Sequence, residues 1–157
     1  MEPAVPGGAG RRQSVLVCDD TESIRRLLAM MLDLDGFEVI EAADGVQALA
    51  LLGDRPVDAI PSVLIVDAQM SPGDGWSVLA SVRADERLRH IPVLMASAEV
   101  TCADQDYERA TTLGLDACLS KPFEPDRVLE LVRGFALQGR AYRVPGHVAP
   151  LKPRGHR

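Results

Sequence analysis

Residues 15–20 read VLVCDD, an apolar run of strand-forming residues that ends in two adjacent carboxylates. A run of valine and leucine without polar interruption is typical of a strand buried on both faces. Two neighbouring carboxylates repel each other, and gathering them in a fold raises their pKa values unless a cation is close. The stretch therefore predicts a buried strand with a charged site at its end.

Strand-like and helix-like segments alternate five times along the chain. Strands are expected at residues 14–19, 37–42, 62–67, 91–97 and 117–120. Amphipathic stretches predict helices at 21–34, 44–52, 76–83, 103–113 and 125–137. Strict alternation requires crossover connections, which give a parallel sheet covered by helices on both faces.

The first helix carries signals for its ends and for its buried face. Thr21 is the expected N-cap, and Gly36 is expected to end the helix. Asp44 is the expected N-cap of the second helix. Helical spacing in the first helix predicts an inward stripe of Ile24, Leu27, Leu28, Met31 and Leu34.

Composition and charge exclude several function classes. The formal net charge is −6, and residues 13–138 hold 22 acidic against 10 basic residues. A domain with this excess of acidic residues is a poor nucleic-acid binder. No apolar run reaches the ~18 residues that span a bilayer, and the N-terminus lacks the apolar core of a signal peptide. We expect a cytoplasmic protein with no direct contact to nucleic acid, no membrane insertion and three reduced cysteines.

The chain is expected to hold one domain with two extensions. Residues 1–12 predict a disordered N-terminal extension, and residues 13–138 predict the folded domain. Residues 139–157 form a basic tail, rich in proline and glycine, that is also expected to be disordered. Because this tail is too short for an output domain, the sequence predicts a stand-alone domain.

Charged and hydroxyl side chains end four of the five predicted strands. Asp19 and Asp20 end the first, Asp67 the third, Ser97 the fourth, and Lys121 follows the fifth. In an open parallel sheet, ligands bind beyond the carboxyl ends of the strands, where the strand order reverses. These five residues are therefore expected to meet in one crevice.

The chemistry of this set points to phosphoryl transfer. Three converging carboxylates suit a hard divalent cation, Mg²⁺ or alternatively Mn²⁺. One carboxylate can then attack phosphorus to form an acyl phosphate, while an ammonium and a hydroxyl stabilise the phosphoryl oxygens. Lys121 is the single lysine beside nine arginines in residues 13–138, and its compact charge suits one phosphoryl oxygen.

Four motifs resemble those of a known family. CDD, VDAQMSPGDGW, VLMASAE and SKPF occur in the order and spacing of the receiver domain of bacterial two-component response regulators, as in stand-alone chemotaxis regulators. The resemblance covers roughly residues 14–137. It implies a flavodoxin-like (βα)5 three-layer fold, with a five-stranded parallel sheet of order 2-1-3-4-5.

The resemblance also implies a role for each site residue. Asp67 would be the phosphoacceptor, Ser97 the switch hydroxyl and Lys121 the contact to phosphate. Mg²⁺ would be held by three carboxylates and one backbone carbonyl, those of Asp19, Asp20, Asp67 and Gln69.

The partners follow from the same resemblance. The donor would be a histidine kinase or a histidine phosphotransfer protein. A downstream protein would bind the face formed by residues 103–113, 117–120 and 125–137. The chain would not be an enzyme beyond self-phosphorylation from small donors and autodephosphorylation.

The sequence departs from the family pattern at two informative places, and two other functions stay open. Met70-Ser71-Pro72 moves the usual proline by one residue, and Cys118 stands where relatives carry an aromatic residue. One alternative is a Mg²⁺-dependent aspartyl-phosphate phosphatase of the haloacid-dehalogenase type. The other is a receiver-fold binding module that signals without phosphorylation.

Overall fold

The computed structural model describes residues 12–98 and 107–145. Five parallel strands form one sheet in the order β2-β1-β3-β4-β5, which confirms the predicted architecture. The strands are β1 (Ser14–Cys18), β2 (Glu38–Ala42), β3 (Val63–Asp67), β4 (Val93–Ser97) and β5 (Ala117–Ser120). The helices are α1 (Glu22–Leu34), α2 (Gly45–Gly53), α3 (Gly75–Ala84), α4 (Tyr107–Leu113) and α5 (Pro125–Gln138), with short 3₁₀ turns η1 (Val57–Ala59) and η3 (Gly139–Ala141).

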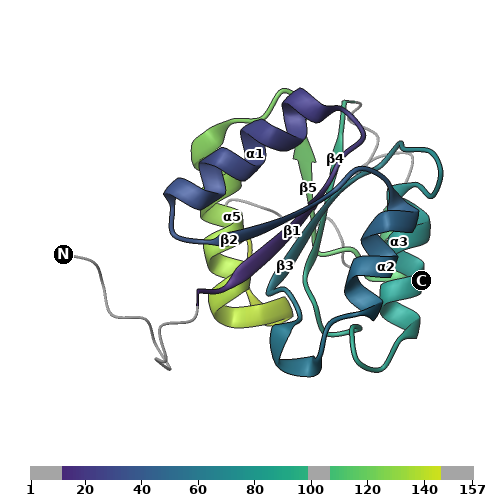
Figure 1. The fold of residues 1–157 in the computed structure, drawn as a ribbon. Helices are drawn as coiled ribbons and strands as arrows, with labels where there is room; N and C mark the ends of the chain where they lie inside the picture. Colours follow the sequence, from purple (N-terminus) through teal and green to yellow (C-terminus); the bar gives the residue numbers. More distant parts are fainter. Residues whose placement is uncertain (1–11, 99–106, 146–157) are drawn as a thin grey trace, which may run out of the picture.

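Helices cover both faces of the sheet. Figure 1 shows α1 and α5 on one face, and α2 and α3 on the other. Successive residues of the central strand β3 point to opposite faces: Val63 and Ile65 pack with α1 and α5, whereas Leu64 and Val66 pack with α2 and α3. Every residue of β3 is buried, as its unbroken apolar run predicts.

The helix starts show how the acidic residues organise the loops. Asp44 and Asp74 are the N-caps of α2 and α3, and each side chain accepts a hydrogen bond from a backbone N–H of the first turn. Thr21 is the N-cap of α1, but its side chain makes no capping bond. Its backbone N–H instead donates to Asp19 Oδ1 at 2.8 Å. The start of α1 is therefore held by a carboxylate of the predicted site.

The buried face of α1 differs from the predicted stripe. Leu28 is buried as expected, and so is Leu32, which lies one helical turn further on. Leu27 and Leu34 are 50% and 81% exposed. Apolar residues surround more of this helix than the sheet can cover, so spacing alone selected the wrong side for those two leucines. Gly36 has φ +101° and follows the last turn, which confirms the predicted helix end.

The described structure continues beyond the expected domain boundary at residue 138. After α5, η3 reverses the chain, and Tyr142 packs edge-on against Phe135 with ring centroids 4.9 Å apart. Further along, Arg127 donates to the carbonyl of Pro145 at 3.5 Å. Residues 139–145 thus run back along α5 rather than leaving the body. The predicted extensions at 1–11 and 146–157 lie outside the described residues.

Among the residues that the structure describes, no helix combines the length and apolar character needed to cross a membrane.

Candidate functional site

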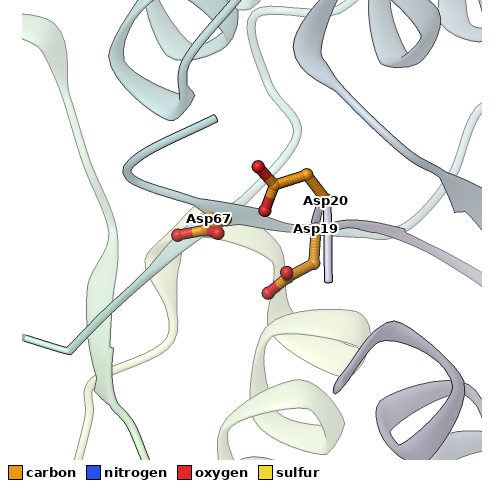
Figure 2. Close-up of side chains that lie close together, drawn as sticks. All are labelled: Asp19, Asp20 and Asp67. Carbon is orange, nitrogen blue, oxygen red and sulfur yellow. The ribbon is translucent and has the colours of Figure 1, made fainter. Parts of the chain in front are cut away.

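The carboxyl ends of β1 and β3 bring the three predicted carboxylates together. Asp19, Asp20 and Asp67 each offer a carboxylate oxygen, and these oxygens all lie within 4.8 Å of one another. Figure 2 shows the three side chains around one small space, with Asp67 facing the pair from β1. Parallel strands produce this convergence because their carboxyl ends lie along one edge of the sheet.

Lys121 enters the same space from the end of β5. Its Nζ lies 3.1 Å from Asp19 Oδ2 and 3.3 Å from Asp67 Oδ2. The backbone N–H of Lys121 donates to the carbonyl of Ser97 at 2.9 Å, which joins the ends of β4 and β5. Lys121 thus pairs with two of the three carboxylates, and Ser97 is linked to Lys121 through this backbone bond.

Burial divides the carboxylates into two kinds. The side chains of Asp19 and Asp67 are 2% and 9% exposed, whereas Asp20 is exposed to solvent. Lys121 is 16% exposed, so it forms its ion pairs in a largely desolvated space. The charge at the two buried positions is the costly part of the site, because buried charges lose hydration.

The pKa of Asp67 is raised above its usual value, first because burial disfavours the charged form. A hydrogen bond from the backbone N–H of Gln69, 3.2 Å from Asp67 Oδ1, opposes this rise, and the negative charge of Asp19 adds to it. For Lys121, burial alone would lower the pKa, but hydrogen bonds to Asp19 and the charges of both carboxylates outweigh it and raise the pKa. The ammonium therefore stays charged.

The loop after β3 reaches its position through close backbone contacts. A Cβ on Gly75 would lie 2.5 Å from the carbonyl oxygen of Asp67, so this position requires glycine. Gly73 adopts φ +82°, and its carbonyl accepts the N–H of Gly45 at 3.0 Å. The Ser71–Pro72 peptide is cis. The displaced proline is thus accommodated, and the loop packs on the N-terminus of α2.

The donor set fits a divalent cation. Three carboxylates and one ammonium leave the site with two negative charges in excess, and all its anionic ligand atoms are oxygens. Oxygen-only sites of this charge suit hard dications such as Mg²⁺. Within the described ranges, this is the one group of acidic, histidine or cysteine side chains that could hold a metal ion. The backbone carbonyl of Gln69 stays a predicted ligand.

Arg25 is a site neighbour that sequence reasoning missed. Its Nη1 donates to the carbonyl of Asp19 at 2.8 Å, and its Nε pairs with Glu41 at 3.1 Å. It therefore anchors the backbone of the first acidic residue from α1. No sequence signal indicates this role, because a long arginine side chain can reach many partners and its contacts with the Asp19 backbone and with Glu41 depend on the fold.

The two described cysteines differ in state. Cys18 is a free, buried thiol whose pKa is raised to about 12, first by burial and then by the charges of Asp44, Asp19 and Asp67. Cys118 is disulfide-bonded, so the expectation of reduced cysteines is wrong for this residue. Cys102 lies outside the described residues.

Comparison with known proteins identifies relatives over most of the chain. The family model described as response regulator receiver domain matches residues 15–133. The DNA-binding dual master transcriptional regulator RpaA of Synechocystis sp. is 34% identical over 131 residues, covering 83% of this chain and 51% of RpaA. The polar-differentiation response regulator DivK of Brucella ovis is 29% identical over 123 residues, covering 78% of this chain and 95% of DivK.

A solved structure agrees with these relatives. Vibrio cholerae chemotaxis protein CheY4 aligns with a TM-score of 0.71 and 29% sequence identity, covering 78% of this chain and 98% of CheY4. The chain thus spans about half of RpaA and nearly the whole of DivK and of CheY4.

Proposed function

The chain belongs to the response regulator receiver domains of two-component signalling, and from this premise we propose that Asp67 accepts the phosphoryl group. Receiver domains bind Mg²⁺ at an acidic pocket and interact with histidine kinases or phosphotransfer proteins. The observation that carries the assignment is the position of Asp67. It is the carboxylate that ends the central strand, lies against Asp19 and contacts Lys121 at 3.3 Å.

The chemistry follows from the side chains around Asp67. A carboxylate oxygen of Asp67 attacks phosphorus, and the bond from phosphorus to the donor histidine nitrogen breaks, with its electron pair returning to that nitrogen. Bound Mg²⁺, held by Asp19, Asp20 and Asp67 with the Gln69 carbonyl, would supply charge neutralisation. Lys121 donates a charge-assisted hydrogen bond to a phosphoryl oxygen, which stabilises the acyl phosphate.

Ser97 and Lys121 connect this chemistry to the rest of the protein. The Ser97 hydroxyl turns toward the new phosphoryl oxygens, and the ends of β4 and β5 follow because the backbones of these two residues are hydrogen-bonded. The face of α4, β5 and α5 is the proposed contact for a downstream protein. Phosphorylation acts by favouring one of two conformers, so its effect equals its differential stabilisation of that conformer.

The remaining assignments complete the proposal. The protein works in the cytoplasm, does not contact nucleic acid directly, and uses Mn²⁺ in place of Mg²⁺ when that ion is supplied. Its covalent chemistry is limited to self-phosphorylation from small donors and autodephosphorylation. The receiver family match supports this over the phosphatase alternative, because that alternative rests on a different family.

Incubation with acetyl phosphate and Mg²⁺, followed by intact mass measurement, tests the acceptor. Wild type is expected to gain one phosphate and Asp67→Asn to gain none. Asp54→Asn is a matched control, because it makes the same change at an exposed helix C-cap of α2. Equal phosphate gain by Asp67→Asn and wild type would overturn the assignment.

A further inference from the structure

An open pocket with basic walls lies away from the phosphoacceptor site. Its volume is about 610 Å³, and its lining residues are Arg83, Arg89, His90, Gly139 and Arg140. It adjoins the starts of β4 and β5, where Asp116 accepts the N–H of Val93 at 2.9 Å, so it lies at the opposite edge of the sheet from Asp67. The volume falls in the range of small-molecule sites.

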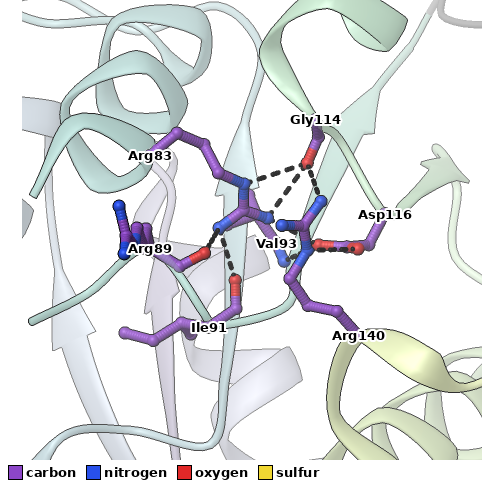
Figure 3. A network of polar contacts seen from close by, with 7 residues as sticks. All are labelled: Arg83, Arg89, Ile91, Val93, Gly114, Asp116 and Arg140. Atoms are coloured by element: carbon purple, nitrogen blue, oxygen red, sulfur yellow. Dashed lines mark hydrogen bonds and ion pairs between the residues drawn. The ribbon is translucent and has the colours of Figure 1, made fainter. Parts of the chain in front are cut away.

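Arg83 builds the wall of this pocket and has no donor left for a ligand. Figure 3 shows its guanidinium surrounded by backbone carbonyls and one carboxylate. Its five N–H groups are directed to Gly114 O at 3.1 and 3.0 Å, Arg89 O at 2.9 Å, Ile91 O at 2.8 Å and Asp116 Oδ2 at 2.7 Å. An arginine can donate five such bonds. Arg83 therefore holds α3 against the segment before β5.

The other cations of the pocket keep donors for a ligand. Arg140 uses Nε toward Asp116 at 2.9 Å and Nη2 toward Gly114 O at 3.1 Å. Within residues 12–98 and 107–145, its Nη1 and the side chains of Arg89 and His90 have no hydrogen-bond partner, and both Arg89 and His90 are exposed. Contacts within the fold account for every donor of Arg83 and for Nε and Nη2 of Arg140. They leave Arg140 Nη1 and the side chains of Arg89 and His90 unused in the described part of the chain.

Charge in the pocket is strongly positive on an acidic body. Asp116 is the one carboxylate of the network in Figure 3, and it pairs with both Arg83 and Arg140. Arg89 lines the same pocket with its guanidinium turned away from Asp116, so three arginines accompany a single carboxylate. Residues 13–138 carry 22 acidic against 10 basic residues. Such a local excess of arginine favours a ligand with a planar or tetrahedral oxyanion, because the guanidinium fork matches its geometry.

We propose that this pocket binds the oxyanion group of a small ligand, a phosphate or a carboxylate, through Arg89, His90 and the free edge of Arg140. Arg83 and Asp116 position these groups and do not contact the ligand. This assignment is independent of the phosphoacceptor, because none of the lining residues belongs to that site.

Titration of the full chain with pyrophosphate and, separately, with citrate tests the pocket by amide chemical shifts. Sodium chloride at matched ionic strength is the blank, and Mg²⁺ is omitted so that the three carboxylates around Asp67 repel anions. Saturable shifts are expected at His90 and Gly139. A response to pyrophosphate identifies a phosphate-bearing ligand, and a response to citrate identifies a carboxylate-bearing one.

Substitutions locate the binding. Arg89→Gln is expected to lower the affinity for whichever anion binds by about tenfold, because it removes charge-assisted hydrogen bonds. The substitution disturbs no described side-chain contact. Arg26→Gln on α1 makes the same change at an exposed arginine outside the pocket and is expected to bind as wild type does. Binding unaffected by Arg89→Gln, or the absence of saturable shifts at His90 and Gly139 with both anions, would overturn the proposal.

Discussion

Neutralising Asp67 is expected to stabilise the folded protein when no Mg²⁺ is bound. Asp67 is buried, its pKa is raised by that burial, and the negative charge of Asp19 raises it further. The substitution Asp67→Asn keeps the shape of the side chain, and the new amide oxygen could still accept the bond from the N–H of Gln69. It removes a negative charge that is disfavoured in the folded protein, as the raised pKa of Asp67 shows. We therefore expect Asp67→Asn to increase the free energy of unfolding.

The distances give the size of this effect. Two carboxylates lie within 4.8 Å of Asp67, and each repulsion is about 3.5 kcal/mol at an effective dielectric constant of about 20. The attraction to Lys121 at 3.3 Å is about 5 kcal/mol on the same scale. Once solvent screens the repulsion from exposed Asp20, repulsion and attraction nearly cancel, and the cost of burying the Asp67 charge, the first cause of its raised pKa, decides the sign. The expected gain is about 1 to 2 kcal/mol.

Urea unfolding in EDTA at neutral pH measures this gain, with Asp54→Asn as an exposed control expected to change stability by less than about 0.5 kcal/mol. Because the folded pKa of Asp67 is raised above 3.8, the wild type loses stability as pH rises through that folded pKa. The advantage of Asp67→Asn should therefore be present at neutral pH and disappear as pH falls toward 3.8. If Asp67→Asn is less stable than wild type in EDTA at neutral pH, attraction to Lys121 outweighs repulsion and the reasoning fails.

One labelling experiment and two glycine substitutions, one of them with a matched control, test the packing around and behind the site. Cys18 is buried and has a pKa of about 12, so its thiol should not react with iodoacetamide in the native protein but should react in urea. Peptide mass measurement would show the added group. Gly75→Ala should lower the free energy of unfolding by about 2 kcal/mol and abolish phosphorylation, because its Cβ would lie 2.5 Å from the backbone. Gly53→Ala is the control: with open space around it, the substitution should raise the free energy of unfolding by up to about 1 kcal/mol in the same urea assay. Gly134→Ala should displace Tyr142, whose ring occupies the place of the new Cβ, and speed amide hydrogen exchange over residues 142–144. Slow exchange there in the variant would show that the tail tolerates the methyl group.

The site was predictable because its residues lie at strand ends. Once strands and helices alternate, the parallel sheet places the carboxyl ends of all strands on one edge. Asp67, Ser97 and Lys121 then come together although they are far apart in the sequence. Their convergence requires only that the strands run parallel in one sheet, which the strict alternation of strands and helices imposes.

Features that depend on long side chains or on helix rotation were not predictable. Arg25 reaches the carbonyl of Asp19, and Arg83 crosses from α3 to Gly114, through flexible stems whose end points the sequence does not encode locally. The exposed side of α1 was assigned wrongly at Leu27 and Leu34 for a related reason. The apolar arc of α1 is wider than the strip that the sheet covers, so only packing against the sheet decides which part of that arc is buried.

The position of Lys121 explains how charge at the site can act on the output face. Its ammonium is shared between Asp19 and Asp67, and its backbone begins the segment that leads from β5 to α5. Under the proposed function, a phosphoryl group on Asp67 would add negative charge on one side of this ammonium and shift its balance between the two carboxylates. Because the Lys121 N–H is bonded to the Ser97 carbonyl, a displacement of Lys121 also acts on the end of β4. Under the proposed function, Lys121 would both respond to the added charge and transmit the change to the ends of β4 and β5.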